Sequence, residues 1–192
     1  SRICFKDSMI LSASGPHERQ WKSLSPGDPF RKRSSAGFVL GNSFYIVSGE
    51  EYTGSIRTGR FSDKNVEYRI EEDSIIIRKP WKKREGASAF TVDGNSYVCC
   101  GMDNTGTPHN DLWMYNALKD TWIEKASISE NSKGSRRNAV SFVIGSKAYI
   151  GTGIGLDGVG ILDDFWEYDP VKDTWIEKAR LPRPRHSAAG FS

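Results

Sequence analysis

Three stretches of the chain repeat one pattern of Phe, Tyr and Gly every 52 residues. They read GFVLGNSFYIVSG at 37–49, AFTVDGNSYVCCG at 89–101 and SFVIGSKAYIGTG at 141–153. The positions that recur at this spacing are Phe38, Phe90 and Phe142, Tyr45, Tyr97 and Tyr149, and Gly49, Gly101 and Gly153. A fixed period of about 50 residues is the mark of a repeat architecture, so the period constrains the fold more than any other feature.

Each stretch has the composition of two short strands around a tight turn. Aromatic and β-branched residues flank Gly41–Asn42, Gly94–Asn95 or Gly145–Ser146. Such a pattern predicts a β-hairpin, because glycine and asparagine tolerate the backbone that a two-residue turn needs.

A second duplication follows the hairpins: YNALKDTWIEKA at 115–126 returns as YDPVKDTWIEKA at 168–179. In both copies Tyr precedes Trp by seven residues across a short polar turn. This spacing predicts a third and a fourth strand with the two rings on neighbouring strands. In the first unit NVEYRI (65–70) and SIIIRKPW (74–81) stand at these places, with a longer gap between Tyr68 and Trp81.

A four-stranded unit of this length, with its spaced Tyr and Trp and its closing glycine, resembles the kelch repeat. Arginines also stand six residues before Phe90, Phe142 and Phe191, at Arg84, Arg136 and Arg185. Kelch blades usually close the second strand with two glycines, whereas the first of the two is here Ser48, Cys100 or Thr152. The YIGTG style is similar to bacterial kelch proteins of the secreted or lipoprotein kind, which favours a secreted, periplasmic or cell-surface location.

The resemblance implies an all-β fold, a kelch-type β-propeller of four-stranded antiparallel blades. We expect residues 1–192 to form one propeller domain or propeller fragment, with full blades at 33–83, 84–130 and 135–180. Residues 1–25 would supply a partial blade, with Trp21 on a fourth strand, and 181–192 the first strand of a further blade. The two ends either join to close a four-bladed ring or belong to a longer propeller, and we favour the latter.

The composition argues against several classes of protein and of site. The charge is balanced, with 27 Lys and Arg against 24 Asp and Glu, which argues against a dedicated nucleic-acid binder. No apolar run reaches the roughly 20 residues that span a bilayer. Cys4, Cys99 and Cys100 make neither a disulfide framework nor a zinc spacing, and we expect the adjacent pair to pack as small hydrophobic residues.

The basic residues are concentrated in the segments between blades. FRKRS (30–34), RKPWKKRE (78–85), KGSRR (133–137) and RLPRPRH (180–186) hold 14 of the 27. These segments lead into the innermost strands, so we expect a basic channel mouth surrounded by more acidic loops. The candidate ligand-binding residues at the mouth are Arg33, Arg84, Arg136, Arg137, Arg185 and His186. The candidate residues on the loop rim are Glu50, Asp103, His109, Asp157 and Asp163.

Each of these candidates also has a structural interpretation. Arginines that begin a blade can pair with carboxylates or strand carbonyls, and clustered charges are more often paired than functional. In kelch proteins that bind peptides or sugars, however, arginines at comparable positions contact the ligand. Asn110–Asp111 and Asp163–Asp164 lack the alternating carboxylates of a calcium loop and favour Asx turns, and His17, His109 and His186 have no metal-ligand spacing.

The expected function is therefore non-catalytic: a scaffold that binds a protein or a glycan, anionic partners included, with no cofactor or metal. No nucleophile elbow, Walker loop or HExxH motif is present. The alternative is a carbohydrate-active enzyme similar to sialic-acid mutarotase-like propellers. There Arg136 or Arg185 would clamp a carboxylate, and a rim acid or His186 would move a proton. The oligomeric state stays open.

Overall fold

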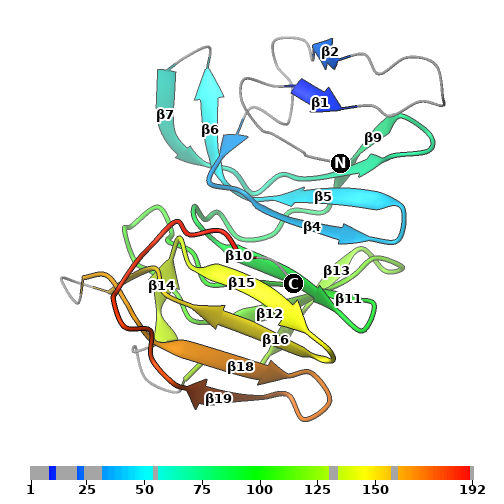
Figure 1. Cartoon of the computed structure of the whole chain (residues 1–192). Helices are drawn as coiled ribbons and strands as arrows, with labels where there is room; N and C mark the ends of the chain where they lie inside the picture. Colours follow the sequence, from blue (N-terminus) through cyan, green and yellow to red (C-terminus); the bar gives the residue numbers. More distant parts are fainter. Residues whose placement is uncertain are drawn as a thin grey trace.

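In the computed structural model, residues 9–11, 21–23, 32–53, 56–129, 134–156 and 160–190 are described. Within these ranges the chain forms three four-stranded antiparallel sheets, each a simple meander (Figure 1). The expected all-β, four-stranded antiparallel architecture is thus confirmed. The first sheet consists of β4 (Ala36–Leu40), β5 (Ser43–Val47), β8 (Asn65–Arg69) and β9 (Ser74–Arg78). The second consists of β10 (Ser88–Val92), β11 (Asn95–Cys99), β12 (Leu112–Asn116) and β13 (Thr121–Lys125). The third consists of β15 (Val140–Ile144), β16 (Lys147–Gly151), β18 (Phe165–Asp169) and β19 (Thr174–Lys178).

The strand register confirms how the sequence repeats were interpreted. Phe90 lies opposite Tyr97 on the first strand pair, and Tyr115 lies opposite Trp122 on the last. The turns run through positive φ at Gly41, Gly94 and Gly145, with φ of 59°, 72° and 57°. Glycine adopts this backbone at no steric cost, which explains its place at the hairpin turns.

Short extra strands gather at the end of the blades opposite these turns (Figure 1). In the first blade, β3 (Lys32–Arg33), β6 (Glu50–Thr53) and β7 (Ile56–Phe61) form a three-stranded sheet. In the third blade, β14 (Arg136–Arg137) pairs with β17 (Ile154–Gly155). The sequence did not predict these strands. They attach each long loop to the segment that begins its blade, so this end of the molecule is built of paired backbone.

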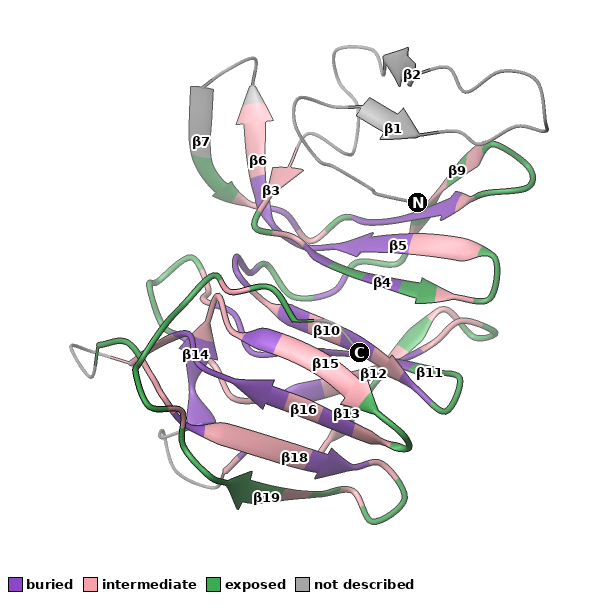
Figure 2. Cartoon of the chain, in the orientation of Figure 1, coloured by how far each residue is buried: buried purple, intermediate pink, exposed green. Residues whose placement is uncertain are grey.

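The core lies between successive blades (Figure 2). One apolar cluster joins the first and second blades through Phe38, Tyr45 and Tyr115, and another joins the second and third through Phe90, Tyr97 and Tyr168. Cys99 and Cys100 are fully buried in the second cluster. The second blade is therefore covered on both faces.

Two segments differ from the expected strands. The fourth strand of the first blade ends at Arg78, before Trp81, because Pro80 has no N–H for the ladder. Trp81 is nevertheless buried and lies 5.3 Å from Trp122 of the next blade, measured between ring centroids. Residues 181–190 form no strand in the described part of the chain, where we expected a first strand.

At the N-terminus, β1 (Met9–Leu11) pairs with β2 (Trp21–Ser23). Leu11 lies opposite Trp21, the relation that Tyr115 has to Trp122 in the second blade. The other residues of the partial blade expected over 1–25 lie outside the described residues.

Candidate functional site

Backbone hydrogen bonds join the starts of successive blades into one continuous row. Gly86 N donates to Ser34 O (2.8 Å), Asn138 N to Gly86 O (2.8 Å) and Ser187 N to Asn138 O (2.9 Å). All four residues have positive φ, between 50° and 63°. The residue before each of them is consequently held at an equivalent place around the axis.

Those preceding residues are Arg33, Glu85, Arg137 and His186. Arg33 and Arg137 are the half-buried cations of the group, with side chains 37% and 29% exposed. Glu85 is nearly buried, and His186 is exposed. We call these four residues the mouth ring. The sequence missed Glu85, although its spacing of 52 residues from both Arg33 and Arg137 could have revealed it.

Both arginines of the mouth ring are engaged by one carboxylate each. Arg33 Nε donates to Glu50 Oε2 at 2.5 Å, and Arg137 Nη1 donates to Glu85 Oε1 of the preceding blade at 2.6 Å. Burial alone would lower the pKa of Arg33, but the carboxylates of Glu50 and, more weakly, Glu85 raise it. A guanidinium has five N–H donors, so each arginine retains donors beyond this bond.

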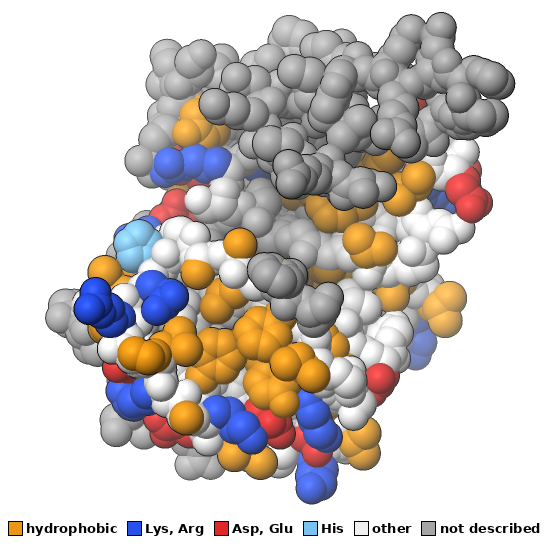
Figure 3. Space-filling model, viewed as in Figure 1, with side chains coloured by type: hydrophobic (Ala, Val, Ile, Leu, Met, Phe, Trp, Pro, Cys, Tyr) orange, Lys and Arg blue, Asp and Glu red, His pale blue; other side chains and the backbone are white. Residues whose placement is uncertain are grey.

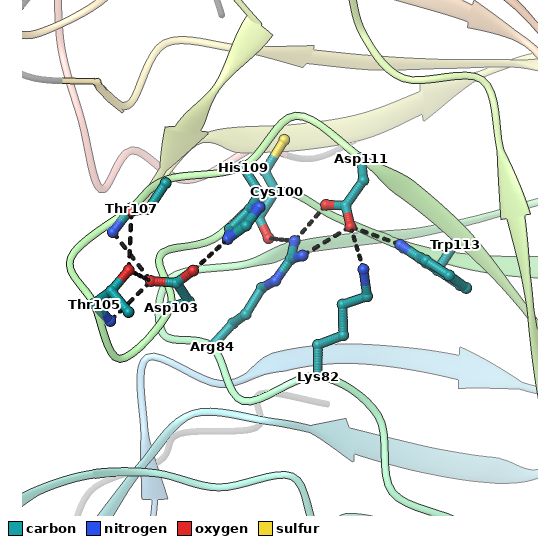
Figure 4. A network of polar contacts seen from close by, with 9 residues as sticks. All are labelled: Lys82, Arg84, Cys100, Asp103, Thr105, Thr107, His109, Asp111 and Trp113. Atoms are coloured by element: carbon teal, nitrogen blue, oxygen red, sulfur yellow. Dashed lines mark hydrogen bonds and ion pairs between the residues drawn. The ribbon is translucent and has the colours of Figure 1, made fainter.

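Arg84 and Arg136 occupy a different environment, because they are buried behind the mouth, 2% and 0% exposed. Arg136 holds Asp164 through two hydrogen bonds of 2.8 and 2.6 Å and donates to Thr152 O at 3.2 Å. Arg84 holds Asp111 in the same bidentate way and donates to Cys100 O (Figure 4). These contacts give both arginines a structural role, so we remove them from the candidate ligand-binding set.

The two aspartates are further tied to the fold by indole N–H groups. Trp113 Nε1 donates to Asp111 and Trp166 Nε1 to Asp164, both at 2.7 Å. Burial opposes ionisation of Asp111, but Arg84, Trp113 and the nearby Lys82 outweigh it and lower its pKa to about 2. The pKa of Asp164 is lowered for the same reasons by Arg136 and Trp166. Both carboxylates are therefore charged at neutral pH.

The first blade lacks this ion pair. Lys32 stands where Arg84 and Arg136 stand, and Lys64 replaces the aspartate before the third strand. The Lys32 ammonium instead donates to the Lys64 backbone carbonyl. Burial lowers the pKa of Lys32 to about 8. The negative charge of Glu51 opposes this shift, whereas the positive charge of Lys64 lowers the pKa further.

On the rim, Asp103 organises the loop of the second blade (Figure 4). Its carboxylate accepts hydrogen bonds from Thr105 N (2.9 Å), from Thr107 N (3.1 Å) and from the side chain of Thr105. Its other oxygen lies 2.7 Å from His109 Nε2. Burial opposes ionisation, but these bonds outweigh it and hold the pKa of Asp103 well below its usual range.

The remaining candidates are scattered. Asp163 accepts from Arg180 at 2.9 Å, Arg185 is exposed, and Glu50 is buried under Arg33. Asp157 lies outside the described residues. Arg33, Arg137 and His186 thus each precede a residue of the hydrogen-bonded row, and Glu50 is bonded to Arg33. Asp103, His109 and Asp163 lie in the loops that follow the second strands.

The part of the chain that is described offers no group of three or more His, Cys, Asp or Glu side chains suited to a metal. Asp111 and Asp164 lie in the segments that the sequence analysis compared with a calcium loop. Their carboxylates instead bind Arg84 and Arg136. Within the same ranges no helix is long and apolar enough to cross a membrane.

Comparison with known proteins identifies the repeat. Residues 4–191 match the family described as the KLHDC2/KLHL20/DRC7 Kelch-repeats domain. A solved structure titled "Structure of YjhT" superimposes with a TM-score of 0.69 at 14% identity, over 89% of this chain and 58% of that one. This likeness supports the propeller fold.

Two curated relatives cover about half of the chain. Kelch-like protein 35 of Homo sapiens is 33% identical over 110 residues, which are 57% of this chain and 17% of that protein. N-acetylneuraminate epimerase of Salmonella typhi is 28% identical over 103 residues, which are 52% of this chain and 25% of that protein. The matched segments thus span a quarter or less of these relatives.

Proposed function

The chain belongs to the kelch-repeat family, and from this premise we propose that it is a protein-binding module whose mouth ring receives an acidic segment of its partner. The observation that carries the proposal is the pair of half-buried arginines, Arg33 and Arg137. Each gives one guanidinium nitrogen to a carboxylate of the fold and keeps further donors. The row of backbone hydrogen bonds fixes the main chain beside them and the ion pairs orient their side chains, so little conformational freedom is lost on binding.

The electrostatics favour an anionic partner. Arg33 and Arg137 are partly exposed, whereas Glu50 and Glu85, whose carboxylates they bind, are buried, at 1% and 6% exposed. The buried pairs behind the mouth are neutral as units, because each combines one arginine with one aspartate. A carboxylate that approaches the axis therefore meets partly exposed cations first, and the charge steers its approach.

Calorimetric titration of the protein with a capped octapeptide of alternating Glu and Asp tests the proposal. Arg137→Gln should weaken binding by about tenfold, since a charge-assisted hydrogen bond contributes roughly 1.4 kcal/mol or more. Arg180→Gln is the matched control, because Arg180 is an exposed arginine that is not one of the four mouth-ring residues and pairs with Asp163 and Glu177. Absence of binding by the unmodified chain, or equal weakening by both variants, would contradict the proposal.

A second candidate is an enzyme that acts on an anionic sugar, as the name of the Salmonella relative indicates for that protein. The residue that favours it is His186, which is exposed at the mouth with Nδ1 3.1 Å from Ser187 Oγ, leaving Nε2 for proton transfer. Titration of the protein with N-acetylneuraminate, with the exchange between the sugar's anomers measured by NMR, distinguishes the enzyme from the protein-binding module. Faster exchange that His186→Gln abolishes would favour the enzyme.

A further inference from the structure

Three rows of paired backbone begin at residues of the mouth ring, one row in each blade. Each row continues at the start of the loop that follows the second strand and then at the return of that loop. Residues directly opposite each other on neighbouring strands lie on the same face, so each row presents its side chains together. The rows are Arg33–Glu50–Phe61, Glu85–Met102–Pro108 and Arg137–Ile154–Ile161.

The rows differ in the side chains that they present. In the first blade the second position is Glu50, which is buried and bonded to the arginine of its row. In the second blade Pro108 is buried and Met102 is half-buried. In the third blade both positions are isoleucines, of which Ile154 is half-buried and Ile161 is 45% exposed. The third row thus joins a half-buried arginine to two accessible aliphatic side chains.

The direction of the two isoleucines follows from their neighbours in the sequence. Gly155 lies opposite Arg136, which is fully buried. A side chain at Gly155 would meet Leu162 at 3.2 Å, so Leu162 packs on this inner side of the strand pair. Because side chains alternate along a strand, Ile154 and Ile161 point to the other side. Arg137, directly opposite Ile154, points to the same side as the isoleucines.

The two isoleucines lie between segments that carry mouth-ring residues. Ile154 is paired with Arg137, and Leu162 O accepts from Arg185 N at 3.2 Å. The second bond brings the segment of His186 beside that of Ile161. Figure 3 shows basic and apolar side chains next to one another at the left of the view, on the side of β14. We call Ile154 and Ile161 the aliphatic strip.

Exposed isoleucines that stand alone are common on protein surfaces and need no function. The aliphatic strip differs because its two members are adjacent and border a cation. Arg137 gives one guanidinium nitrogen to Glu85 and keeps further donors. An apolar centre beside a polar group with unused hydrogen-bonding capacity is the arrangement found in protein interfaces.

The register sets the spacing of a ligand that contacts both Arg137 and the strip. Neighbouring strands are about 4.8 Å apart, so the strip covers the region from about 5 to 10 Å beyond the backbone of Arg137. In an extended peptide, residues two positions apart lie on one face and are separated by about 6.8 Å. A peptide that crosses the row with its carboxylate at Arg137 therefore places the side chain two positions away on the strip.

We propose that the aliphatic strip is a specificity subsite, which selects partner segments with a large aliphatic residue two positions from the acidic residue that Arg137 binds. This inference rests on the proposed function and deepens it, since it names the sequence class of the acidic segment. Arg137 positions the carboxylate, and Ile154 and Ile161 remove the aliphatic side chain from water. Acidic segments that lack this side chain bind more weakly.

Calorimetric titration with three capped pentapeptides tests the proposal. Their sequences are Glu-Gly-Ile-Gly-Glu, Glu-Gly-Ser-Gly-Glu and Glu-Ile-Gly-Gly-Glu. The first should bind at least about fivefold more tightly than the second, because burial of the isoleucine adds to the ion pair. It should also bind more tightly than the third, which has the same composition and charge but the wrong spacing.

Ile161→Thr is the diagnostic variant, because the side chain is accessible and threonine keeps its β-branched shape. This change should abolish the preference for the first peptide and alter the affinity for the serine peptide less than twofold. Arg137→Gln should weaken binding of all three peptides. Ile176→Thr is the matched control, since Ile176 is an isoleucine of β19 that is 54% exposed, and the preference should survive it.

The outcomes separate this inference from the proposal on which it rests. Equal affinity for the three peptides, or a preference that survives Ile161→Thr, would overturn the subsite and leave the binding of acidic segments standing. A preference that Ile176→Thr also removes would contradict the subsite, because the effect would then not be local. Binding of none of the peptides would overturn both.

Discussion

At the end of each second strand, two successive residues adopt positive φ. The pairs are Ser48–Gly49, Cys100–Gly101 and Thr152–Gly153. Thr152 and Gly153 have φ of 63° and 101°. The second position demands glycine, because a Cβ at Gly153 would lie 2.7 Å from the carbonyl oxygen of Arg137. The first position admits a side chain, which explains how this chain departs from the usual kelch glycine pair.

Gly153→Ala should therefore destabilise the protein by about 2–4 kcal/mol, through both the strained backbone and the clash with backbone that cannot move. Gly145→Ala is the control. Gly145 also has positive φ, but no atom lies within 4 Å of the added methyl group. It should cost only about 1 kcal/mol. Urea denaturation measures both, and an equal loss in the two variants would refute the steric argument.

The buried aspartates make stability depend on pH in the acid range. The pKa of Asp111 is about 2 in the folded chain and about 3.9 when unfolded, so its contribution is fully present above pH 4. It is lost as the pH falls from about 4 to 2, and amounts to roughly 2 kcal/mol. Asp164 acts in the same direction.

Unfolding free energies between pH 2 and 6 check this expectation. Asp111→Asn should lower the stability at pH 6 and flatten its acid dependence. Asp163→Asn is the comparison, because that carboxylate is a half-buried rim group bonded to the exposed Arg180. An unchanged acid slope in Asp111→Asn would show that the Arg84–Asp111 pair does not carry the dependence.

At the scale of elements, the contribution of a phenylalanine to stability depends on which face of a blade carries it. Phe90 is 5% exposed between the second and third blades, whereas its equivalent Phe142 lies on the open face. Phe90→Ala should cost about 3–5 kcal/mol, the usual loss for a buried phenylalanine. Phe142→Ala should cost less than half of that. Similar losses in thermal or urea unfolding would mean that the third blade is covered on both faces.

The period of the sequence predicted the regular elements because their strands depend on local pattern. Tyr115 lies opposite Trp122 as the seven-residue spacing indicated. The β6–β7 hairpin escaped prediction, since its residues read as a polar loop and its pairing with β3 is a long-range contact. The end of β9 was misjudged because Trp81 fits the repeat, while Pro80 before it stops the ladder.

The site was harder to predict than the fold for a comparable reason. Arg84 and Arg137 look alike in the sequence, and both lie in segments that begin blades. Their opposite environments follow from the partner that folding places beside each: a bidentate aspartate behind the mouth for Arg84, and a glutamate of the neighbouring blade for Arg137. Sequence spacing gives the position of a side chain in the repeat, but not its burial.

At the scale of the whole molecule, we expect the blades to differ in local stability. In repeat proteins each unit contacts only its neighbours, so local stability reflects the unit and its two interfaces. The second blade packs on β4 of the first and β15 of the third and holds the Arg84–Asp111 pair. The first blade has Lys32 and Lys64 at the positions of that pair. We therefore expect the first blade to open more readily.

Hydrogen exchange should show faster exchange in β5 and β8 than in β11 and β12, because local opening sets the rate. Replacing Lys32→Arg together with Lys64→Asp restores the pair that the other blades contain, and should slow exchange in the first blade at least about fivefold, which corresponds to roughly 1 kcal/mol. Lys79→Arg, an exposed lysine of the same blade, should leave the rates unchanged. If the double variant exchanges like the unmodified chain, the missing ion pair is not what distinguishes the first blade, and its weakness must be sought in its contacts with the second.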